Sequence, residues 1–206
     1  MPYVGIVNDP DTIAAGKNLV APAGQVTGTE EYVDYLNDTV MSTQTAEKQA
    51  QIEKQAAAGL AKHNYYKGLS AEQAAQADKI AKNVANALLN DSTKKTDLDR
   101  VRAAAQFTEL CCGECYYGAD EEKTYRSPYG VFIGGMFTCS GSTRALGRIL
   151  DYMGIDWDHA NENQDTHQWC IVTLDGQQAW ADGMAGKADY GNDGRAGLMK
   201  YGIIPL

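Results

Sequence analysis

The first half of the chain has the spacing of apolar and polar residues that is typical of helices. Residues 44–62 consist largely of Ala, Gln, Glu and Lys, which are good helix formers. Residues 71–89 carry apolar side chains three and four positions apart. Ser70 precedes them, and Gln73 completes the capping-box pattern that begins a helix. Residues 44–113 are therefore expected to form an Ala-rich helical layer whose apolar stripes serve packing.

The segments around this layer differ from it in pattern. Residues 1–43 show little periodicity and contain three of the five prolines, so they are predicted to be an extension or linker. A third helix of the layer is expected to begin after Thr96, because two acidic residues in its first turn suit the helix dipole. Residues 44–206 are predicted to form one domain, in which a catalytic core over about residues 125–206 follows the helices.

A further helix is predicted over residues 138–154, which read TCSGSTRALGRILDYMG. Its apolar positions recur at helical spacing and comprise Ala145, Leu146, Ile149, Leu150 and Met153. Arg144, Arg148 and Asp151 fall on other faces of this helix, and Gly154 is suited to end it. This pattern places Cys139 at, or just before, the beginning of a helix.

Downstream, residues 167–182 read HQWCIVTLDGQQAWAD and predict a β-hairpin. Asp175-Gly176 is typical of a two-residue type I′ turn, and both flanking runs are rich in β-forming residues. With this turn, alternate residues share a face. One face holds His167, Trp169, Ile171, Trp180 and Asp182. The other face, which includes Cys170, has the composition of a core. His167 and Asp182 are therefore expected to be diagonal neighbours within side-chain reach, whereas a register slip of one residue would separate them.

The position of Cys139 gives its thiol a chemical interpretation. N–H groups in the first turn of a helix lack partners, and the helix dipole is positive there, so a thiolate is stabilised and an oxyanion can be bound. Taken alone, a cysteine is more often a small buried apolar residue. If this helix packs on the face that carries His167 and Asp182, the three residues form a nucleophile, a base and a group that orients the base.

Charge and hydropathy exclude some classes of function. The formal net charge is −9 and the isoelectric point is about 4.8, so binding to nucleic acid is not expected. No apolar run is long enough to span a membrane. The first 18 residues lack the pattern of a basic segment followed by an apolar one that marks a secretory leader, which leaves the compartment open.

Three of the five cysteines cluster at Cys111, Cys112 and Cys115, in a segment over residues 111–130 that is predicted to be a loop. The Cys112-x-x-Cys115 spacing permits a redox pair or half of a zinc site. A zinc site needs further ligands, and a thioredoxin-type pair needs a βαβ context, neither of which the sequence provides. A local disulfide or buried thiols are therefore favoured, and a redox function for this cluster is the weakest of the hypotheses.

The stretch SPYGVFIGGMFTCSGSTRALGRILDYMGI resembles the nucleophile segment of bacterial transglutaminase-like domains, and HQWCIVTLDGQQAWAD is similar to their His-x-Trp segment. The resemblance covers about residues 125–185. It implies a papain-like α+β fold, with the nucleophile helix packed against an antiparallel sheet. It also implies acyl transfer through a thioester, with Cys139 as nucleophile, His167 as base and Asp182 as orienting group.

The resemblance carries further expectations. Tyr129 aligns with a tyrosine near the nucleophile and either donates to the oxyanion or packs, with packing favoured. Trp169 and Trp180 would shield the triad from water or pack in the sheet. The chain departs from the family pattern at Ser142 and at Gly183, and both differences bear on the shape of the cleft. No cofactor is implied, and a bacterial surface location is favoured by the resemblance alone.

Two functions follow from these observations. The first is a cysteine enzyme that attacks a Gln side chain or a peptide amide of a protein substrate, with either an amine or water resolving the thioester. The second is a catalytically silent binding or scaffold module with the same fold. Among the remaining histidines, His63 is expected to be structural, and His159 is expected to lie in a solvated loop.

Overall fold

The computed structural model describes residues 46–119, 121–164, 166–191, 194 and 199, so the predicted extension over residues 1–43 lies outside the described residues. Three helices form one side of the molecule: α3 (Ala46–Lys62), α4 (Ala71–Asn90) and α5 (Asp97–Gly113). The predicted capping box of α4 is confirmed, because the Ser70 hydroxyl accepts the Gln73 N–H at 3.1 Å and the Gln73 side chain accepts the Ser70 N–H. The third helix begins after Thr96, as expected.

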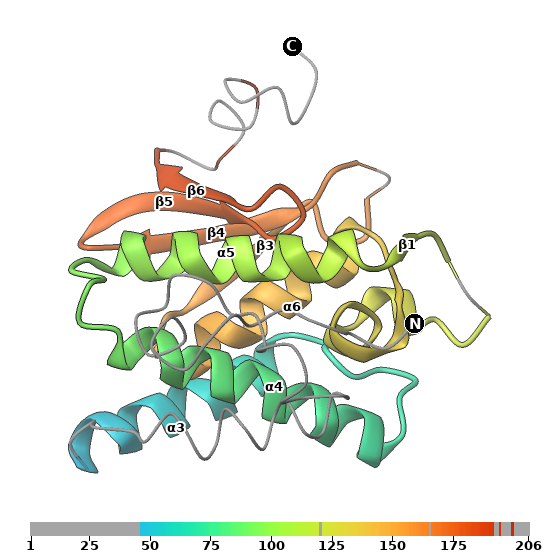
Figure 1. Cartoon of the computed structure of the whole chain (residues 1–206), viewed down its shortest axis with the longest axis horizontal. Coiled ribbons are helices and arrows are strands. Elements are labelled where there is room, and N and C mark those ends of the chain that lie inside the picture. Colours follow the sequence, from blue (N-terminus) through green and yellow to red (C-terminus); the bar gives the residue numbers. More distant parts are fainter. Residues whose placement is uncertain (1–45, 120, 165, 192–193, 195–198, 200–206) are drawn as a thin grey trace, which may run out of the picture.

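A four-stranded antiparallel sheet forms the other side (Figure 1). Its strands occur in sequence order: β3 (Trp157–Ala160), β4 (Trp169–Leu174), β5 (Gln177–Asp182) and β6 (Lys187–Tyr190). The chain therefore belongs to the α+β class. Neither β3 nor β6 was predicted from the sequence, because both are short and carry charged residues.

The predicted hairpin and its register are confirmed. Leu174 lies opposite Gln177, and Val172 lies opposite Ala179. Asp175 and Gly176 both have positive φ, at 52° and 76°, as a type I′ turn requires. The Asp175 carboxylate also accepts the first two N–H groups of α5, at 3.0 and 3.2 Å, which fixes the hairpin against that helix.

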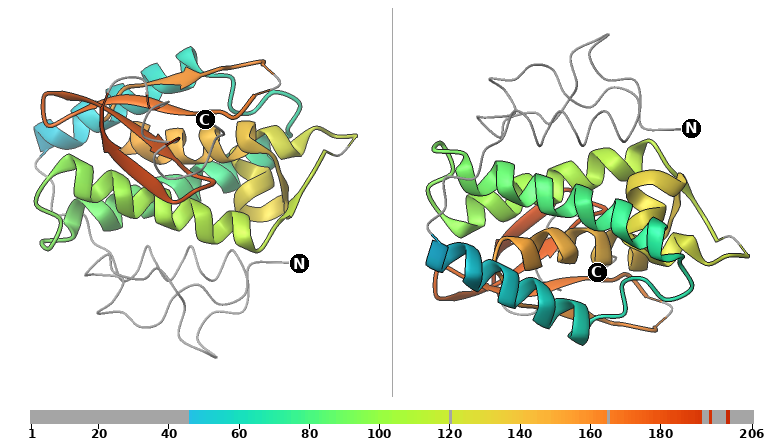
Figure 2. Two further views of the ribbon diagram at one scale, coloured as in Figure 1. Left: turned by 90° about the horizontal axis from the view of Figure 1, so that it is seen from above. Right: turned by 90° about the horizontal axis from the view of Figure 1, so that it is seen from below.

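Helix α6 (Cys139–Tyr152) runs between the helical side and the sheet, and it packs against α3, α4, α5 and β4 (Figures 1 and 2). The sequence predicted an apolar stripe on this helix, with polar residues on its other faces. In the structure, every face is covered, so Arg144, Arg148 and Asp151 are buried. Gly147 permits the closest approach to the sheet, since a Cβ there would lie 2.1 Å from the Trp157 ring.

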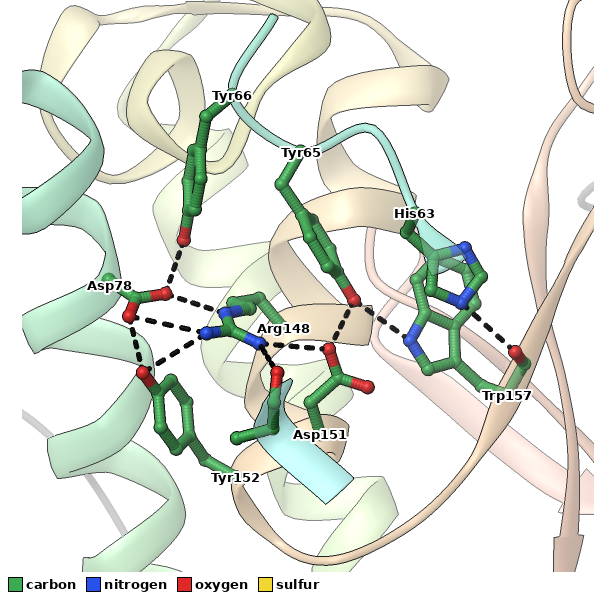
Figure 3. A network of polar contacts seen from close by, with 9 residues as sticks. His63, Tyr65, Tyr66, Asp78, Arg148, Asp151, Tyr152 and Trp157 are labelled. Atoms are coloured by element: carbon green, nitrogen blue, oxygen red, sulfur yellow. Dashed lines mark hydrogen bonds and ion pairs between the residues drawn. The ribbon is translucent and has the colours of Figure 1, made fainter. Parts of the chain in front are cut away.

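Two of the buried polar residues of α6, Arg148 and Asp151, belong to one network of polar contacts (Figure 3). Arg148 donates to Asp78 of α4 at 2.6 Å, to the Ala56 carbonyl of α3 at 2.6 Å and to Asp151 at 3.2 Å. Asp151 also accepts the Tyr65 hydroxyl at 2.6 Å. Because a buried charge is costly unless it is paired, these contacts hold α3 and α4 in one position against the middle of α6.

The segment between α5 and α6 is more regular than the predicted loop. Strand β1 (Tyr116–Tyr117) pairs in parallel with β2 (Met136–Phe137), just before α6. Between them lie a 3-10 turn, η1 (Thr124–Arg126), and a π-helical turn, η2 (Gly130–Gly134). This arrangement brings β1 beside the beginning of α6. No helix in the described part of the chain has the length and apolarity needed to cross a bilayer.

Candidate functional site

Cys139 is the first residue of α6, as the sequence predicted. The preceding residue, Thr138, makes no side-chain cap, and its carbonyl accepts the N–H groups of Gly141 and Ser142 at 2.9 and 3.1 Å. Gly141 is needed for close packing here, because a Cβ would lie 2.3 Å from the Tyr125 carbonyl oxygen. The turn η1 is therefore pressed against the first turn of α6, which holds the thiol at the molecular surface.

His167 and Asp182 are in direct contact through Nε2 of the imidazole and Oδ2 of the carboxylate. Asp182 is fully buried at the end of β5. Its other oxygen accepts the backbone N–H groups of Met184 and Ala185 at 2.9 and 3.1 Å. The carboxylate is thus fixed by the turn that follows it, and it holds the imidazole in one orientation.

The thiol meets the imidazole by a route that the sequence argument did not foresee. The sequence joined the three residues on the condition that α6 packs on the face of the hairpin that carries His167 and Asp182. Instead, α6 packs on the opposite face, where the Cys170 thiol lies 3.5 Å from the Thr143 carbonyl oxygen. His167 precedes β4, and outside the strand the alternation of faces no longer holds. Its ring therefore lies near Cys139 beyond the end of the sheet, where both line one cleft and are close enough to alter each other's pKa.

The two reactive groups alter each other's pKa. Burial alone would lower the pKa of His167, but the hydrogen bonds to Asp182 and Cys139 outweigh burial and raise it to about 9. Burial alone would raise the pKa of the Cys139 thiol, but the hydrogen bond and positive charge of His167, with the N–H of Gln168, lower it. These directions favour a thiolate beside an imidazolium near neutral pH, which is the reactive form of a cysteine nucleophile.

Tyr117 is a member of the site that sequence reasoning missed. Its side chain lines the cleft with Cys139, and its hydroxyl helps to lower the pKa of the Cys139 thiol. Its ring lies edge-on to Phe137 at 5.3 Å, so the β1–β2 pairing sets its position. No local pattern marks this tyrosine, because it reaches Cys139 through strand pairing between separate segments.

The aromatic residues suggested by the resemblance lie behind the site. Tyr129 is half-buried against the hydrophobic core, as favoured, and it is not among the described residues that line the cleft at Cys139. Trp169 and Trp180 are buried with Ala160 in a small cluster on the outer face of the sheet. The Trp169 ring is nearly parallel to that of His167, with 6.2 Å between the ring centroids. Both tryptophans therefore pack in the sheet, and Trp169 also backs the imidazole.

His159 differs from its prediction as a solvated loop residue. It lies in β3 with a buried side chain, and its Nε2 is 2.7 Å from the Gln168 side-chain oxygen. Burial lowers the pKa of His159 to about 4, so the ring is neutral at pH 7 and donates this hydrogen bond. This hydrogen bond also fixes the side chain of Gln168, whose backbone N–H faces the Cys139 thiol. His63 is structural, as expected, because its ring stacks on Trp157 at 3.8 Å.

A cleft of about 680 Å³ opens at the thiol. Its wall includes Cys139 and His167, together with Tyr117, Ser140 and Thr166. The Cys139 sulfur lies 3.9 Å from the Thr166 carbonyl oxygen, so the loop before β4 forms one edge of the cleft. The nucleophile is therefore accessible to a substrate, whereas the carboxylate that supports it is not.

The cysteine cluster lies away from this chemistry. All five cysteines are thiols; Cys111 and Cys112 are buried in the last turn of α5, where a loop was expected. Burial raises the pKa of the Cys112 thiol well above its ordinary range and that of Cys115 to about 11. Among the described residues, no group of three or more His, Cys, Asp or Glu side chains is arranged to hold a metal ion.

Comparisons with protein-family models, with curated proteins and with solved structures found no match to this chain. The chemistry of the site is therefore inferred from its own residues and their arrangement.

Proposed function

We propose that this chain is a cysteine enzyme with a transglutaminase-like, papain-like arrangement, and that it transfers acyl groups from amide carbonyls. The observation that carries the proposal is the series Cys139, His167 and Asp182, with the thiol at a helix N-terminus and in an open cleft. The Asp182 carboxylate contacts the imidazole, and the imidazole and the thiol shift each other's pKa. Asp182 holds Nε2 of the imidazole, which leaves Nδ1 as the nitrogen for the thiol. A base that is oriented in this way presents one nitrogen, Nδ1, to the proton of the Cys139 thiol.

The reaction begins with the Cys139 thiolate attacking the carbonyl carbon of the substrate amide. The C–S bond forms as the carbonyl oxygen becomes an oxyanion, which the first N–H groups of α6 stabilise. The His167 imidazolium then gives its proton to the leaving nitrogen, the C–N bond breaks, and a thioester remains on Cys139. The neutral imidazole next takes a proton from an incoming amine or water as it attacks the thioester carbonyl. The new C–N or C–O bond forms, the C–S bond breaks and the acyl product leaves, which restores the Cys139 thiolate beside the His167 imidazolium.

Both an amine acceptor and water suit these three residues, so cross-linking, deamidation and proteolysis share one acylation step. The carbonyl can belong to a Gln side chain or to a peptide bond. The residues of the cleft wall decide which nucleophile reaches the thioester, because the nucleophile must approach from the open side of Cys139.

A silent binding module is the second candidate, and the position of Tyr117 favours it. The Tyr117 hydroxyl lies near Cys139 in the cleft, beside the first N–H groups of α6 that an oxyanion would use. A substrate carbonyl must displace this hydroxyl or fit beside it. If the hydroxyl is never displaced, the cleft binds a partner without turnover.

The direct test is alkylation of the native protein by limiting iodoacetamide between pH 5 and 9, with each thiol followed by peptide mass spectrometry. Cys115 is a matched internal control, because it is also half-buried but its pKa is raised to about 11. We expect Cys139 to react first at pH 6. In His167→Ala this reaction should slow by roughly 10- to 100-fold, as the thiolate fraction of an ordinary thiol requires.

Turnover is then read from mass changes in a Gln-containing peptide incubated with and without a primary amine. Amine addition indicates cross-linking chemistry, a gain of about 1 Da indicates deamidation, and cleavage indicates proteolysis. Rapid alkylation of Cys139 without any of these products across a broad peptide set would favour the silent module. A thiol as slow as Cys115 would refute the catalytic proposal outright.

A further inference from the structure

The cleft beside Cys139 continues into a second hollow of about 350 Å³, and the two share Arg126, Arg144 and Asn163 as lining residues. The second hollow is also lined by Lys67 and Lys123. Four of the chain's 18 Lys and Arg residues therefore gather along one continuous depression. Glu122 is the single acidic residue among the described residues that line either hollow.

This positive charge is the reverse of the charge on the chain as a whole, which carries a formal net charge of −9. In an acidic protein, a local group of cations along a cleft creates a positive electrostatic potential at the place where a substrate enters. Solubility accounts for the acidic surface but gives no reason for cations to gather beside a nucleophile.

Arg144 connects this charge to the reactive end of α6. It is 7% exposed, and its guanidinium donates to Glu162 at 2.8 Å and to the Arg126 carbonyl at 3.3 Å. It also contacts the Ser140 hydroxyl, one residue after Cys139. Residues four apart share one face of a helix, and side chains lean toward the helix N-terminus, so this guanidinium lies beside the nucleophile.

The other three cations remain available to a ligand. Lys67, Lys123 and Arg126 are exposed, and none forms an ion pair with a carboxylate among the residues that the structure describes. The Arg126 guanidinium lies over the Tyr125 ring, 5.3 Å from its centroid, and this contact does not neutralise its positive charge. Charged groups that face a cleft without an internal partner are suited to pair with a charge on a bound molecule.

We propose that the cleft selects acidic peptide substrates, in which an Asp or Glu side chain close to the reacting amide is bound by Lys123 and Arg126, with Arg144 and Lys67 extending the positive field. The proposal rests on the proposed function of Cys139 and names its substrate class. A carboxylate held there places the neighbouring carbonyl at the open side of the thiol.

The test uses three thiol-directed probes that share one reactive group and differ in charge: iodoacetyl-Asp-amide, iodoacetyl-Asn-amide and iodoacetyl-Lys-amide. Their rates of alkylation of Cys139 are measured on the full chain at pH 6 and low salt. We expect the Asp probe to react roughly tenfold faster than the Asn probe, and the Lys probe to be slowest. This preference should shrink in 1 M NaCl, where charges are screened over about 3 Å.

The preference should fall to below about threefold in the Lys123→Gln/Arg126→Gln variant, since removing rim charges acts mainly on the association rate. The matched control is Lys54→Gln/Lys95→Gln, which removes the same charge from exposed positions outside the cleft. The control should keep the wild-type preference. The residual preference in the cleft variant reports the charges that remain, those of Arg144, Lys67 and the His167 imidazolium.

Equal rates for the three probes, or an undiminished preference in the Lys123→Gln/Arg126→Gln variant, would overturn this proposal and leave the proposed function intact. Uniformly slow alkylation, at the rate of an ordinary thiol, would overturn the proposed function, while the ratio among the probes would still test the charge of the cleft. The two failures are therefore distinguishable in one experiment.

Discussion

The two ends of helix α6 use polar residues in opposite ways. In its middle and last turns, Arg148 and Asp151 are 2% and 0% exposed and are bonded to side chains from α4 and the segment after α3 (Figure 3). At its first turn, Cys139 is half-buried at an open cleft. One end fixes the position of the helix, and the other presents a group that can react.

The shifts in pKa also differ between the two ends of α6. Burial tends to lower the pKa of Arg148, but its contacts with Asp78 raise it, so the guanidinium stays charged. The pKa of Cys139 is lowered and that of His167 is raised instead, which favours transfer of a proton from the thiol to the imidazole. A perturbed pKa thus marks function only where the group is accessible and its partner can exchange a proton with it.

The substitution with the greatest expected consequence removes the buried cation in the middle of α6. Arg148→Met should lower the free energy of unfolding by roughly 3–5 kcal/mol, because it leaves buried carboxylates without their cation. Arg100→Met is the matched control, since Arg100 pairs with Asp97 on the surface of α5, and such pairs contribute about 0–1 kcal/mol. Denaturant unfolding measures both. Equal losses would contradict a structural role for the buried network.

The next effect concerns the group that orients the base. Asp182→Asn preserves the shape of a buried side chain but removes its charge, so the imidazolium loses support. We expect alkylation of Cys139 by iodoacetamide at pH 6 to slow by about tenfold. The same substitution at exposed Asp158, which pairs with Lys62, should leave the rate unchanged. An unaltered rate in Asp182→Asn would remove this residue from the triad.

The contributions of the Cys139 thiol and the His167 imidazole to stability can be distinguished by their dependence on pH. The raised pKa of His167 contributes stability below pH 6.5, which is lost as pH rises toward about 9. The lowered pKa of Cys139 acts in the opposite direction, because its contribution grows as pH rises through the folded value. The two offset each other in the wild type. Cys139→Ala should therefore lose stability between pH 6.5 and 9 relative to the wild type, in unfolding curves taken at each pH.

The smallest expected effect is that of Tyr117→Phe. The hydroxyl helps to lower the pKa of the Cys139 thiol, but less than His167 does, so its loss should slow alkylation at pH 6 by about threefold. Tyr116→Phe is a matched control on the same strand. If the rate rises instead, the hydroxyl acts mainly as a cover over the thiol, which would strengthen the silent-module alternative.

The sequence by itself determined the elements whose signals are local. The capping box at Ser70, the helix start after Thr96, the beginning of a helix at Cys139 and the Asp175-Gly176 turn each depend on residues within a few positions of one another. The turn sets the hairpin register, so the meeting of His167 and Asp182 was also predictable. Whether the site performs acyl transfer stays a prediction.

Features that depend on contacts between distant segments could be known only from the tertiary structure. Periodicity shows which side of α6 is apolar, but it does not show that other elements cover every side, so the burial of Arg148 and Asp151 had no sequence signal. The face of the sheet that α6 covers, the place of Tyr117 on Cys139, and the gathering of cations from separate segments along one cleft are of the same kind. Chain alternation and helical spacing fix directions within one element, whereas packing fixes which elements meet.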